Sequence, residues 1–580
     1  MRIAMPETTH EFSTWTWPQI EPIMRGLAAR TLTAENLKKW LADWSHLLSL
    51  LEETRAYLQV ATSVDTSDAE AEARFDAFQE EIYTPAAAAN QEIKEHLLNS
   101  ALAVPPGFEF PMRNMRAEAD LFCEENLSLV SDEQKLVNQY NKIVGAQTAE
   151  WEGEDVTLYQ LEAKLQDPDR ATRERAWRLR VKRQLIDQEA INILWAKLVA
   201  LRHQMALNAG FKDYRAFRWQ QMHRFDYTPE DCLRFHQAIE AGAVPAVNRI
   251  YERYRQCLGV SSLRPWDLEV DPFGRPPLQP FSDVEELENK AAAIFNHIDP
   301  QLGGYFDIMR QERLLDLGNR KNKAPHGWCM TYPLVRKAFI FMNAVGWQRD
   351  VMMLLHEAGH AFHVFEMAQL PYYHQLQVPN EFLEVASMAV ELLAGPYLAA
   401  SRGGFYSEED AARARVKHLE DAIVVSWPYI AAMDAFQHWV YTNPSAAIDA
   451  ATSGAKWAEI WLRFMPGVDW SGLDDALTIS WQCIPHFFGW PFSGIEYGMA
   501  QLGAVQIWRN ALDDQADAIA RYRKALSLGC TVPLLSLYET AGAELSFDAE
   551  TLRQAVTLME CTIADLSDKS ELPNSSRGTR

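Results

Sequence analysis

A chain of 580 residues exceeds the size of one ordinary hydrophobic core, so its length predicts two or more subdomains. Hydrophobic residues make up 48% of the sequence, which excludes an intrinsically disordered chain. The formal net charge of -24 at pH 7 argues against binding to nucleic acid or to an anionic membrane, because Lys and Arg supply the contacts to phosphate.

The sequence predicts a cytoplasmic protein with reduced thiols. Its first residues, MRIAMPETTHEF, lack the apolar region of a secretory signal, and no stretch is long and apolar enough to span a membrane. The seven cysteines are scattered, odd in number and without a CxxC pair, which is unlike a disulfide framework.

Helical periodicity dominates the N-terminal part of the chain. Between residues 34 and 58, apolar side chains recur at spacings of three and four, and Thr33 is the expected N-cap. Residues 67–83 are expected to fold back as the second half of a helical hairpin, and the Pro-rich segment 104–111 interrupts the helices. We therefore expect an N-terminal helical region over residues 1–195.

Strand signals are few and lie further along the chain. A Pro-rich segment, 264–281, is followed by Ser282, which predicts a capping box with Glu285 three residues later. AFIFMN, residues 338–343, is the clearest strand, and stretches near 265–272 and 328–333 could join it in a small sheet. An exposed edge strand there could pair with an extended peptide, although 338–343 could equally be a buried strand.

The run DVMMLLHEAGHAFHVFEMA contains the pattern HExxH at His356, Glu357 and His360. On a helix, residues four apart lie one turn above each other, so His356 and His360 can direct two imidazoles at one metal ion. Glu357 would lie beside that ion, where a carboxylate can accept a proton from water. The alternative is that both histidines belong to the core and are bonded to backbone or carboxylate groups.

A catalytic zinc site needs a third protein ligand and an open position for water. Glu366 lies six residues after His360, roughly 600° around the same helix, and so faces away from the pair. Glu384 is the better candidate, because Pro371 and Pro379 end the first helix and Asn380 is the expected N-cap of a new one.

Glu391 lies two turns after Glu384 on the same face of this second helix. Burying both carboxylates among Leu, Val and Met is costly unless each has a strong partner. A metal ion for one and a metal-ligating histidine for the other would provide these partners. The alternative for each glutamate taken alone is exposure to solvent.

These motifs resemble the M3 zinc oligopeptidases, a family that includes thimet oligopeptidase, neurolysin and bacterial oligoendopeptidase F. The resemblance rests on HEAGHAFH, residues 356–363, and on the ExxS block that begins at Glu384. It implies that His356, His360 and Glu384 bind one Zn2+ per chain and that Glu357 is the general base. It further implies that Glu391 supports a ligand and that His363 has a supporting or structural role.

Other stretches extend the resemblance over roughly residues 190–560. They are 198–219, 224–232, 323–333, 338–343 and 484–504, the last of which resembles a family segment whose His and Tyr reach the substrate carbonyl.

His486 and Tyr497 hold those positions in this chain. Where relatives place further tyrosines, this chain has Trp490, Phe492 and Ile495, so Tyr497 is the phenol that remains to stabilise an oxyanion.

We therefore expect a mainly α, multi-helix zincin-type metallopeptidase with a small β-sheet near the active site and a deep central cleft. The catalytic region is expected at 196–565 and a polar tail at 566–580. The predicted substrates are short, unstructured peptides cut at internal bonds.

Three alternatives remain open from the sequence: a dipeptidyl-carboxypeptidase-type exopeptidase of the same family, a helical binding protein that keeps zinc without catalysis, and a purely structural helical scaffold. The sequence carries no signal for an oligomeric state.

Overall fold

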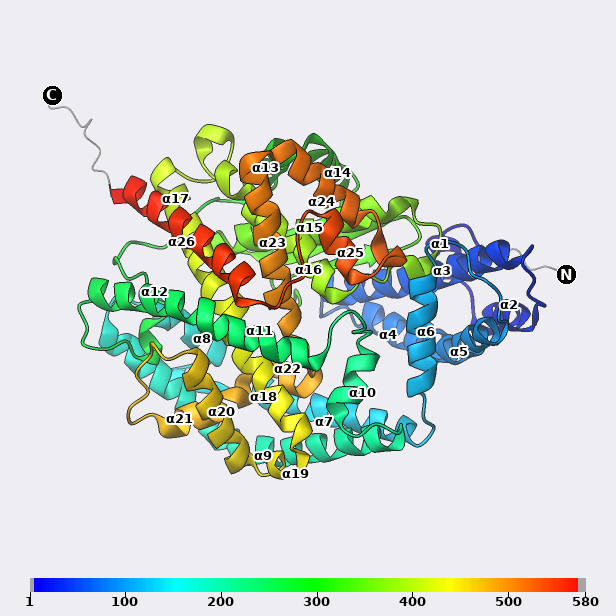
Figure 1. Ribbon diagram of the computed structural model, residues 1–580, viewed down its shortest axis with the longest axis horizontal. Helices are drawn as coiled ribbons and strands as arrows, with labels where there is room; N and C mark the ends of the chain where they lie inside the picture. The colour runs from blue at the N-terminus through cyan, green and yellow to red at the C-terminus, as the bar shows by residue number, and fades with distance from the viewer. Residues whose placement is uncertain (1–4, 572–580) are drawn as a thin grey trace.

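The computed structural model describes residues 5–571, and most of them lie in helices (Figure 1). The first helices are α1 (Thr9–Phe12), α2 (Trp17–Ala29), α3 (Leu37–Val64), α4 (Ala69–Phe78), α5 (Thr84–Asn99), α6 (Glu109–Leu121), α7 (Asn126–Gly145), α8 (Leu158–Glu162) and α9 (Arg170–Asn208). The next are α10 (Tyr214–Gln221), α11 (Pro229–Gly242), α12 (Val244–Cys257), α13 (Val284–Ile298), α14 (Pro300–Gln311), α15 (Gln348–Glu366), α16 (Asn380–Ala394), α17 (Glu408–Val424) and α18 (Ile430–Thr442). The last are α19 (Pro444–Ala447), α20 (Ala450–Phe464), α21 (Asp474–Ile479), α22 (Pro485–Gly489), α23 (Ile495–Asp513), α24 (Gln515–Leu526), α25 (Leu534–Thr540) and α26 (Ala549–Glu571).

The N-terminal helices gather at one end of the molecule, and α26 lies at the other (Figure 1). The expected hairpin is confirmed, because α4 packs back against α3 and the Asp68 carboxylate caps its first turn. The expected cap at Thr33 is wrong. The Thr33 and Asn36 side chains each accept the other's backbone N–H, which forms a turn, and α3 begins only at Leu37.

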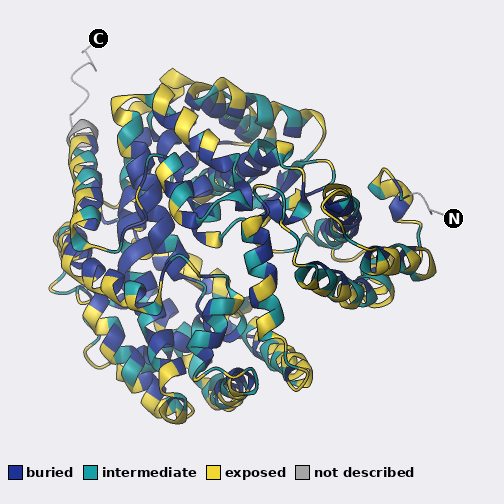
Figure 2. Cartoon of the chain, turned by 45° about the vertical axis from the view of Figure 1, so that its right-hand side comes forward, coloured by how far each residue is buried: buried dark blue, intermediate teal, exposed yellow. Residues whose placement is uncertain are grey.

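Two large apolar cores lie in this architecture. One belongs to α1–α6 and is centred on tryptophans such as Trp40 and Trp44, and the larger one extends from Tyr140 to Leu566. Figure 2 shows the buried residues concentrated on the inner faces of the helices and the exposed residues on the outer faces.

The three-stranded sheet has the order β3–β5–β4, with β3 (Leu315–Gly318) parallel and β4 (Trp328–Tyr332) antiparallel to β5 (Lys337–Ala344). The predicted strand at 338–343 is confirmed as β5 and that near 328–333 as β4. One face of β5 enters the main core, and its Phe339 and Phe341 pack on the other side against Ala56 and Val60 of α3. The sheet therefore joins the N-terminal helices to the rest of the chain.

The stretch 265–272 does not join this sheet, so that expectation is wrong. Pro265–Asp267 forms a 3-10 turn, because the Asp267 carboxylate accepts hydrogen bonds from Arg170 and Arg173 of α9. The next helix starts one residue later than expected. Asp283, rather than Ser282, caps α13, and its partner is the backbone N–H of Glu286.

A second, small sheet consists of the hairpin β1 (Thr148–Trp151) and β2 (Glu154–Thr157), which leads directly into α8. The helix that follows, α9, is continuous from Arg170 to Asn208, so the boundary expected between residues 195 and 196 falls inside it. Trp195 and Leu198 on this helix are both part of the main core.

At the C-terminal end, α26 continues through Glu571. The first residues of the expected polar tail, 566–571, are therefore helical, and 572–580 lie outside the described residues. Within the described range, no helix has the length and apolar content that crossing a membrane requires. The seven cysteines, all of which lie in this range, are free.

Candidate metal centre

The helix α15 carries both histidines of the HExxH pattern. It begins at a tight turn in which one oxygen of Asp350 accepts the backbone N–H groups of Val345, Gly346 and Trp347, at 2.8, 2.9 and 2.9 Å. Two turns further on, the rings of His356 and His360 are 4.9 Å apart between centroids. The pattern therefore forms a helix with both imidazoles on one side, as expected.

The second helix, α16, crosses α15 at Gly359. A Cβ atom built on Gly359 would lie 2.5 Å from the Cα of Ser387 and 2.7 Å from the carbonyl oxygen of Ala386. Because real Cβ atoms do not come so close to backbone, only glycine permits this approach. The crossing brings Glu384 against the histidines. The expected cap is off by one residue, because Pro379 is the N-cap and Asn380 the first helical residue.

His356, His360 and Glu384 converge. Their ligand atoms all lie within 4.8 Å of one another. Oε2 of Glu384 is 3.5 Å from Nε2 of His356 and 3.9 Å from Nε2 of His360, both too long for a good hydrogen bond. Two ligands bonded tetrahedrally to one zinc ion at about 2.0–2.2 Å stand about 3.4 Å apart. The donor set and its spacing therefore fit a zinc ion.

Glu391 links this centre to a residue that the sequence did not reveal. Its Oε1 lies 2.7 Å from Nδ1 of His356, and its Oε2 lies 2.8 Å from Nε2 of His418 on α17. Such a carboxylate fixes the orientation of a metal-ligating imidazole. His418 lies more than 50 residues beyond HExxH with no motif of its own, so spacing alone could not identify it.

Burial sets the protonation of the carboxylates near the histidines. It raises the pKa of Glu384 to about 7, with the charge of His356 opposing, and it also raises the pKa of Glu357. Burial also acts to raise the pKa of Glu391. The hydrogen bonds from His356 and His418 outweigh this effect and lower the pKa of Glu391 to about 2. Glu391 is therefore the fixed negative charge of the group.

The histidine pKa values separate in the same way. Burial would lower the pKa of His356, but the hydrogen bond and charge of Glu391 outweigh it and raise the pKa to about 9. Burial lowers the pKa of His360 well below the ordinary histidine range. His363 is fully buried against Phe382, and burial lowers its pKa to about 3 although a backbone hydrogen bond at Leu526 opposes the shift. It lies in the core beside the centre and not in the group of ligand atoms.

Tyr497, at the start of α23, is close enough for the charges of Glu384 and Glu357 to act on its phenol. Burial first, and then these charges, raise its pKa. His486 lies in the short helix α22, and its pKa is lowered by burial and raised by the charge of Glu496. Its ring lies 6.0 Å from that of Trp490. Of the two residues, Tyr497 is the one whose pKa is raised by the charges of Glu384 and Glu357.

Glu366 faces away from the histidines, as expected. Its carboxylate accepts hydrogen bonds from Arg523, at 2.6 Å, and from the Tyr305 hydroxyl, at 3.2 Å.

A second cluster of potential ligands, Cys232, Asp434 and His438, lies buried between α11 and α18. Neighbouring protein groups already engage two of the three: His236 Nε2 is 2.8 Å from Asp434 Oδ2, and Arg215 donates to Nδ1 of His438. Nε2 of His438 lies 3.1 Å from the same oxygen of Asp434. Because these neighbours occupy one ligand atom of Asp434 and one of His438, the cluster is a weaker metal-site candidate than the histidine centre.

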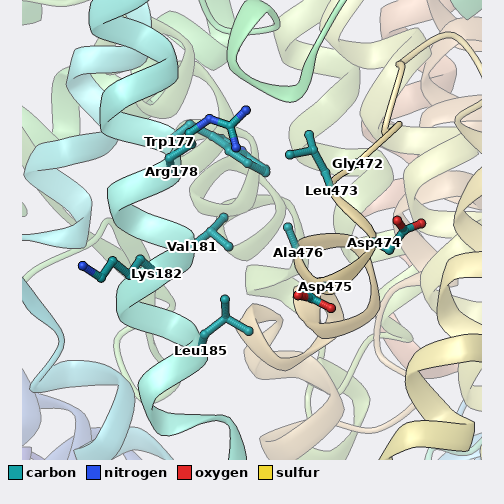
Figure 3. Close-up of a pocket in the computed structure, with 10 residues that line it drawn as sticks. All are labelled: Trp177, Arg178, Val181, Lys182, Leu185, Gly472, Leu473, Asp474, Asp475 and Ala476. Carbon is teal, nitrogen blue, oxygen red and sulfur yellow. The ribbon is translucent and has the colours of Figure 1, made fainter.

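Two hollows of different character lie along α9. The larger, of about 1070 Å³, is lined by α7, α8 and α9 on one side and by the residues before and within the first turns of α15 on the other. The smaller, of about 260 Å³, lies between α9 and residues 472–476 (Figure 3). Figure 3 shows Val181 and Leu185 directed toward Ala476, and Lys182 directed away. The smaller hollow is lined by apolar side chains and by the charged Arg178, Lys182, Asp474 and Asp475, and its described lining residues include no pair of histidines like that of the candidate metal centre.

Residues 163–557, more than half of the chain, match the model of peptidase family M3. Among solved structures, a protein assigned as oligoendopeptidase F shares 25% sequence identity with a TM-score of 0.83, covering 95% of this chain and 97% of that one. PZ peptidase A, solved with an inhibitor, also shares 25% identity with a TM-score of 0.83, covering 98% of this chain and 100% of that one.

A protein from Bacillus anthracis assigned as oligoendopeptidase F has a TM-score of 0.79 at 24% identity and covers 98% of this chain and 99% of its own. No curated protein matches this chain. The resemblance found in the sequence and the mainly α, zincin-type fold are both confirmed.

Proposed function

Because this chain belongs to peptidase family M3 and is a metallopeptidase, we propose that it is a zinc-dependent endopeptidase acting on internal bonds of short, unstructured peptides. The observation that carries this proposal is the convergence of His356, His360 and Glu384 within 4.8 Å, beside the buried Glu357. The names of the similar structures, oligoendopeptidase F and PZ peptidase A, agree with a peptide substrate.

In this proposal His356, His360 and Glu384 hold one zinc ion per chain. When bound, zinc supplies Lewis acidity, which polarises the scissile carbonyl and makes water more acidic. Glu391 and His418 keep the His356 ring in place, with Nδ1 engaged and Nε2 directed at the site.

Glu357 is proposed as the general base. Its carboxylate accepts a proton from the attacking water and passes it to the amine that leaves. Burial raises its pKa above the ordinary glutamate value, so that its proton affinity moves toward neutral pH, where transfer in both directions is efficient.

Tyr497 is proposed to stabilise the oxyanion. Its raised pKa keeps the phenol protonated at neutral pH, so it can donate a hydrogen bond to the charge that develops on the carbonyl oxygen. His486 is proposed as a secondary donor on the same segment. His363 would act only through packing.

The test of this function is cleavage of a quenched peptide of about ten residues with both ends blocked. A chelator should stop cleavage and stoichiometric zinc should restore it, while the Glu357→Gln variant should stay inactive. Cleavage only of peptides with a free C-terminus would instead support the dipeptidyl-carboxypeptidase alternative. Zinc binding without any cleavage would support a non-catalytic binding protein. A cytoplasmic location remains part of the proposal, and the free thiols are compatible with it.

A further inference from the structure

The larger hollow, of about 1070 Å³, slightly exceeds the usual range of ligand pockets. It is lined by two groups of elements, described next, and by Ile479, Gln482 and Cys483. One wall is formed by the end of α7, the β2–α8 corner and the face of α9. The other wall consists of the loop before β4, the turn between β5 and α15, and the first turn of α15. We refer to it as the aromatic cavity, for the side chains described next.

Three large apolar side chains that are exposed to solvent line the aromatic cavity. Tyr159 on α8 is 66% exposed, and Val345 and Trp347 on the opposite wall are 53% and 50% exposed. Leaving such side chains in water is unfavourable, and their concentration on facing walls of one cavity indicates a surface that a ligand covers.

Both walls hold these side chains on fixed backbone. The turn at 345–347 is fastened by the Asp350 carboxylate, and Gly346 permits it with a φ of +99°. On the other wall, Thr157 and Gln160 form a reciprocal capping box, which fixes the first turn of α8 next to Tyr159. The rings are therefore presented on rigid elements, as a specificity pocket requires.

The aromatic cavity adjoins the metal centre along α15 and β4. Met353, which lines the cavity, is three residues before His356, a rise of about 4.5 Å along the helix. Gly327, which also lines the cavity, directly precedes β4, an edge strand of the three-stranded sheet in the described part of the chain. Further along β4, Cys329 is close enough to Glu357 for the charge of that carboxylate to raise its pKa, after the larger effect of burial. An extended peptide paired with β4 would thus run from the centre toward the cavity.

Most charged groups of the aromatic cavity are already engaged, which argues against ionic recognition. Arg180 pairs with Glu162 at 3.5 Å. Lys323 donates to Asp316 and to backbone carbonyls, and Asp350 accepts three N–H groups as described. Among the described lining residues, Arg349 is the charged group that remains without a partner, and it is exposed at the rim.

We propose that the aromatic cavity binds a bulky aromatic side chain of the peptide substrate, at a position removed from the cleaved bond, and that Trp347 and Tyr159 determine this preference. The inference rests on the proposed function, because it places the cavity on the path of the same peptide. The inference assigns a substrate class: peptides that carry a large aromatic residue at one fixed distance from the cleaved bond.

The experiment uses the zinc-loaded full-length protein and a set of blocked, quenched peptides in which one position at a time is Phe or Ala. At one position relative to the cut, Phe should give a roughly tenfold higher kcat/KM than Ala, mainly through KM. Trp347→Ala and Tyr159→Ala should each reduce this Phe-to-Ala ratio by roughly fivefold, and Trp347→Phe should retain most of it. Phe122→Ala, which removes an equally exposed ring away from the cavity, should leave the ratio unchanged.

A binding measurement keeps this test independent of turnover. Fluorescence anisotropy of the labelled Phe and Ala peptides on Glu357→Gln protein should show the same ratio in Kd and the same loss on Trp347→Ala. No preference at any position, or an equal loss for both peptides in the Trp347 and Tyr159 variants, would overturn the inference. A protein that binds the peptides with the aromatic preference but cleaves none would instead refute the proposed function and leave this inference standing.

Discussion

Oε2 of Glu391 lies 2.8 Å from Nε2 of His418, a contact through which a third helix reaches the candidate metal centre without adding to its three candidate ligands. The other oxygen of Glu391 accepts from Nδ1 of His356 at 2.7 Å. Because the carboxylate is held from both sides, it keeps Nδ1 of His356 engaged and the ring oriented with Nε2 toward Glu384 and His360. The centre therefore depends on α15, α16 and α17 together.

The first prediction concerns this chain of contacts. His418→Ala should weaken zinc binding by about 10- to 100-fold, because Glu391 loses the partner that orients it. Competition with a fluorescent zinc chelator measures the affinity, and His297→Ala, at an exposed histidine, is the control. Unchanged zinc affinity in His418→Ala would show that His356 alone is enough to position Glu391.

The second prediction separates metal binding from proton transfer. Glu357→Gln keeps the size and polarity of the side chain but cannot accept a proton, so kcat should fall by at least about 10²-fold. Metal analysis should still give one zinc per chain. Substantial activity in this variant would remove Glu357 from its role as general base.

The third prediction concerns the oxyanion. Tyr497→Phe removes one hydroxyl group from a half-buried ring and should lower kcat by about 10²- to 10³-fold with little change in KM. His486→Ala should have a smaller effect, because its ring is in electrostatic contact with Glu496 and not with the carboxylates of the centre. A larger loss in the His486 variant would reverse the order of the two donors.

The fourth prediction concerns the helix crossing at Gly359. A methyl group there would meet backbone atoms of Ser387 and Ala386 at 2.5 and 2.7 Å, so Gly359→Ala should separate α15 from α16. Both the thermal midpoint and the zinc content should fall, since Glu384 would move away from the histidines. Gly26→Ala is the matched control: this helical glycine has open space around its Cβ, and the change should be neutral or stabilising by up to about 1 kcal/mol.

The fifth prediction concerns pH and stability. Asp267 is fully buried, and although burial opposes ionisation, the hydrogen bonds from Arg170 and Arg173 lower its pKa below the ordinary value of 3.8. The ionised carboxylate therefore stabilises the fold above that pH, and this contribution is lost as the pH falls through the folded-state pKa. Asp267→Asn should cost about 3 kcal/mol at neutral pH, because it leaves buried Arg173 uncompensated.

Thermal unfolding of both proteins from pH 7 to about pH 2 checks the sign. The difference between wild type and Asp267→Asn should stay at its full size down to about the ordinary aspartate pKa and should narrow as the pH falls below that value toward the lower folded-state pKa. A difference that stays constant over this range would mean that the charge of Asp267 does not contribute.

The local pattern predicted the elements that carry the metal centre. The spacing of His356 and His360, the prolines that end the first helix, and the glutamates seven residues apart on the second were enough to anticipate two packed helices. Helix ends were less predictable. At Thr33 and Ser282 neighbouring polar residues compete for one cap, and the choice depends on side-chain geometry that sequence does not specify. At Asn380 the preceding residue, Pro379, takes the cap position without a side-chain hydrogen bond.

Contacts between distant segments could not be predicted. His418 reaches Glu391 only through the packing of α17, and Asp267 holds two arginines nearly 100 residues away in α9. The ion pairs of Asp267 also explain why the chain near 265–272 forms a turn and not the expected strand, because tertiary ion pairs override a weak local preference for strand.

The most direct test of the zinc centre is a crystal structure of the zinc-loaded protein with anomalous scattering measured at the zinc edge. We predict a single strong peak per chain at bonding distance from Nε2 of His356, Nε2 of His360 and a carboxylate oxygen of Glu384. A peak at another cluster, or a Glu384 carboxylate turned away from the ion, would contradict the account.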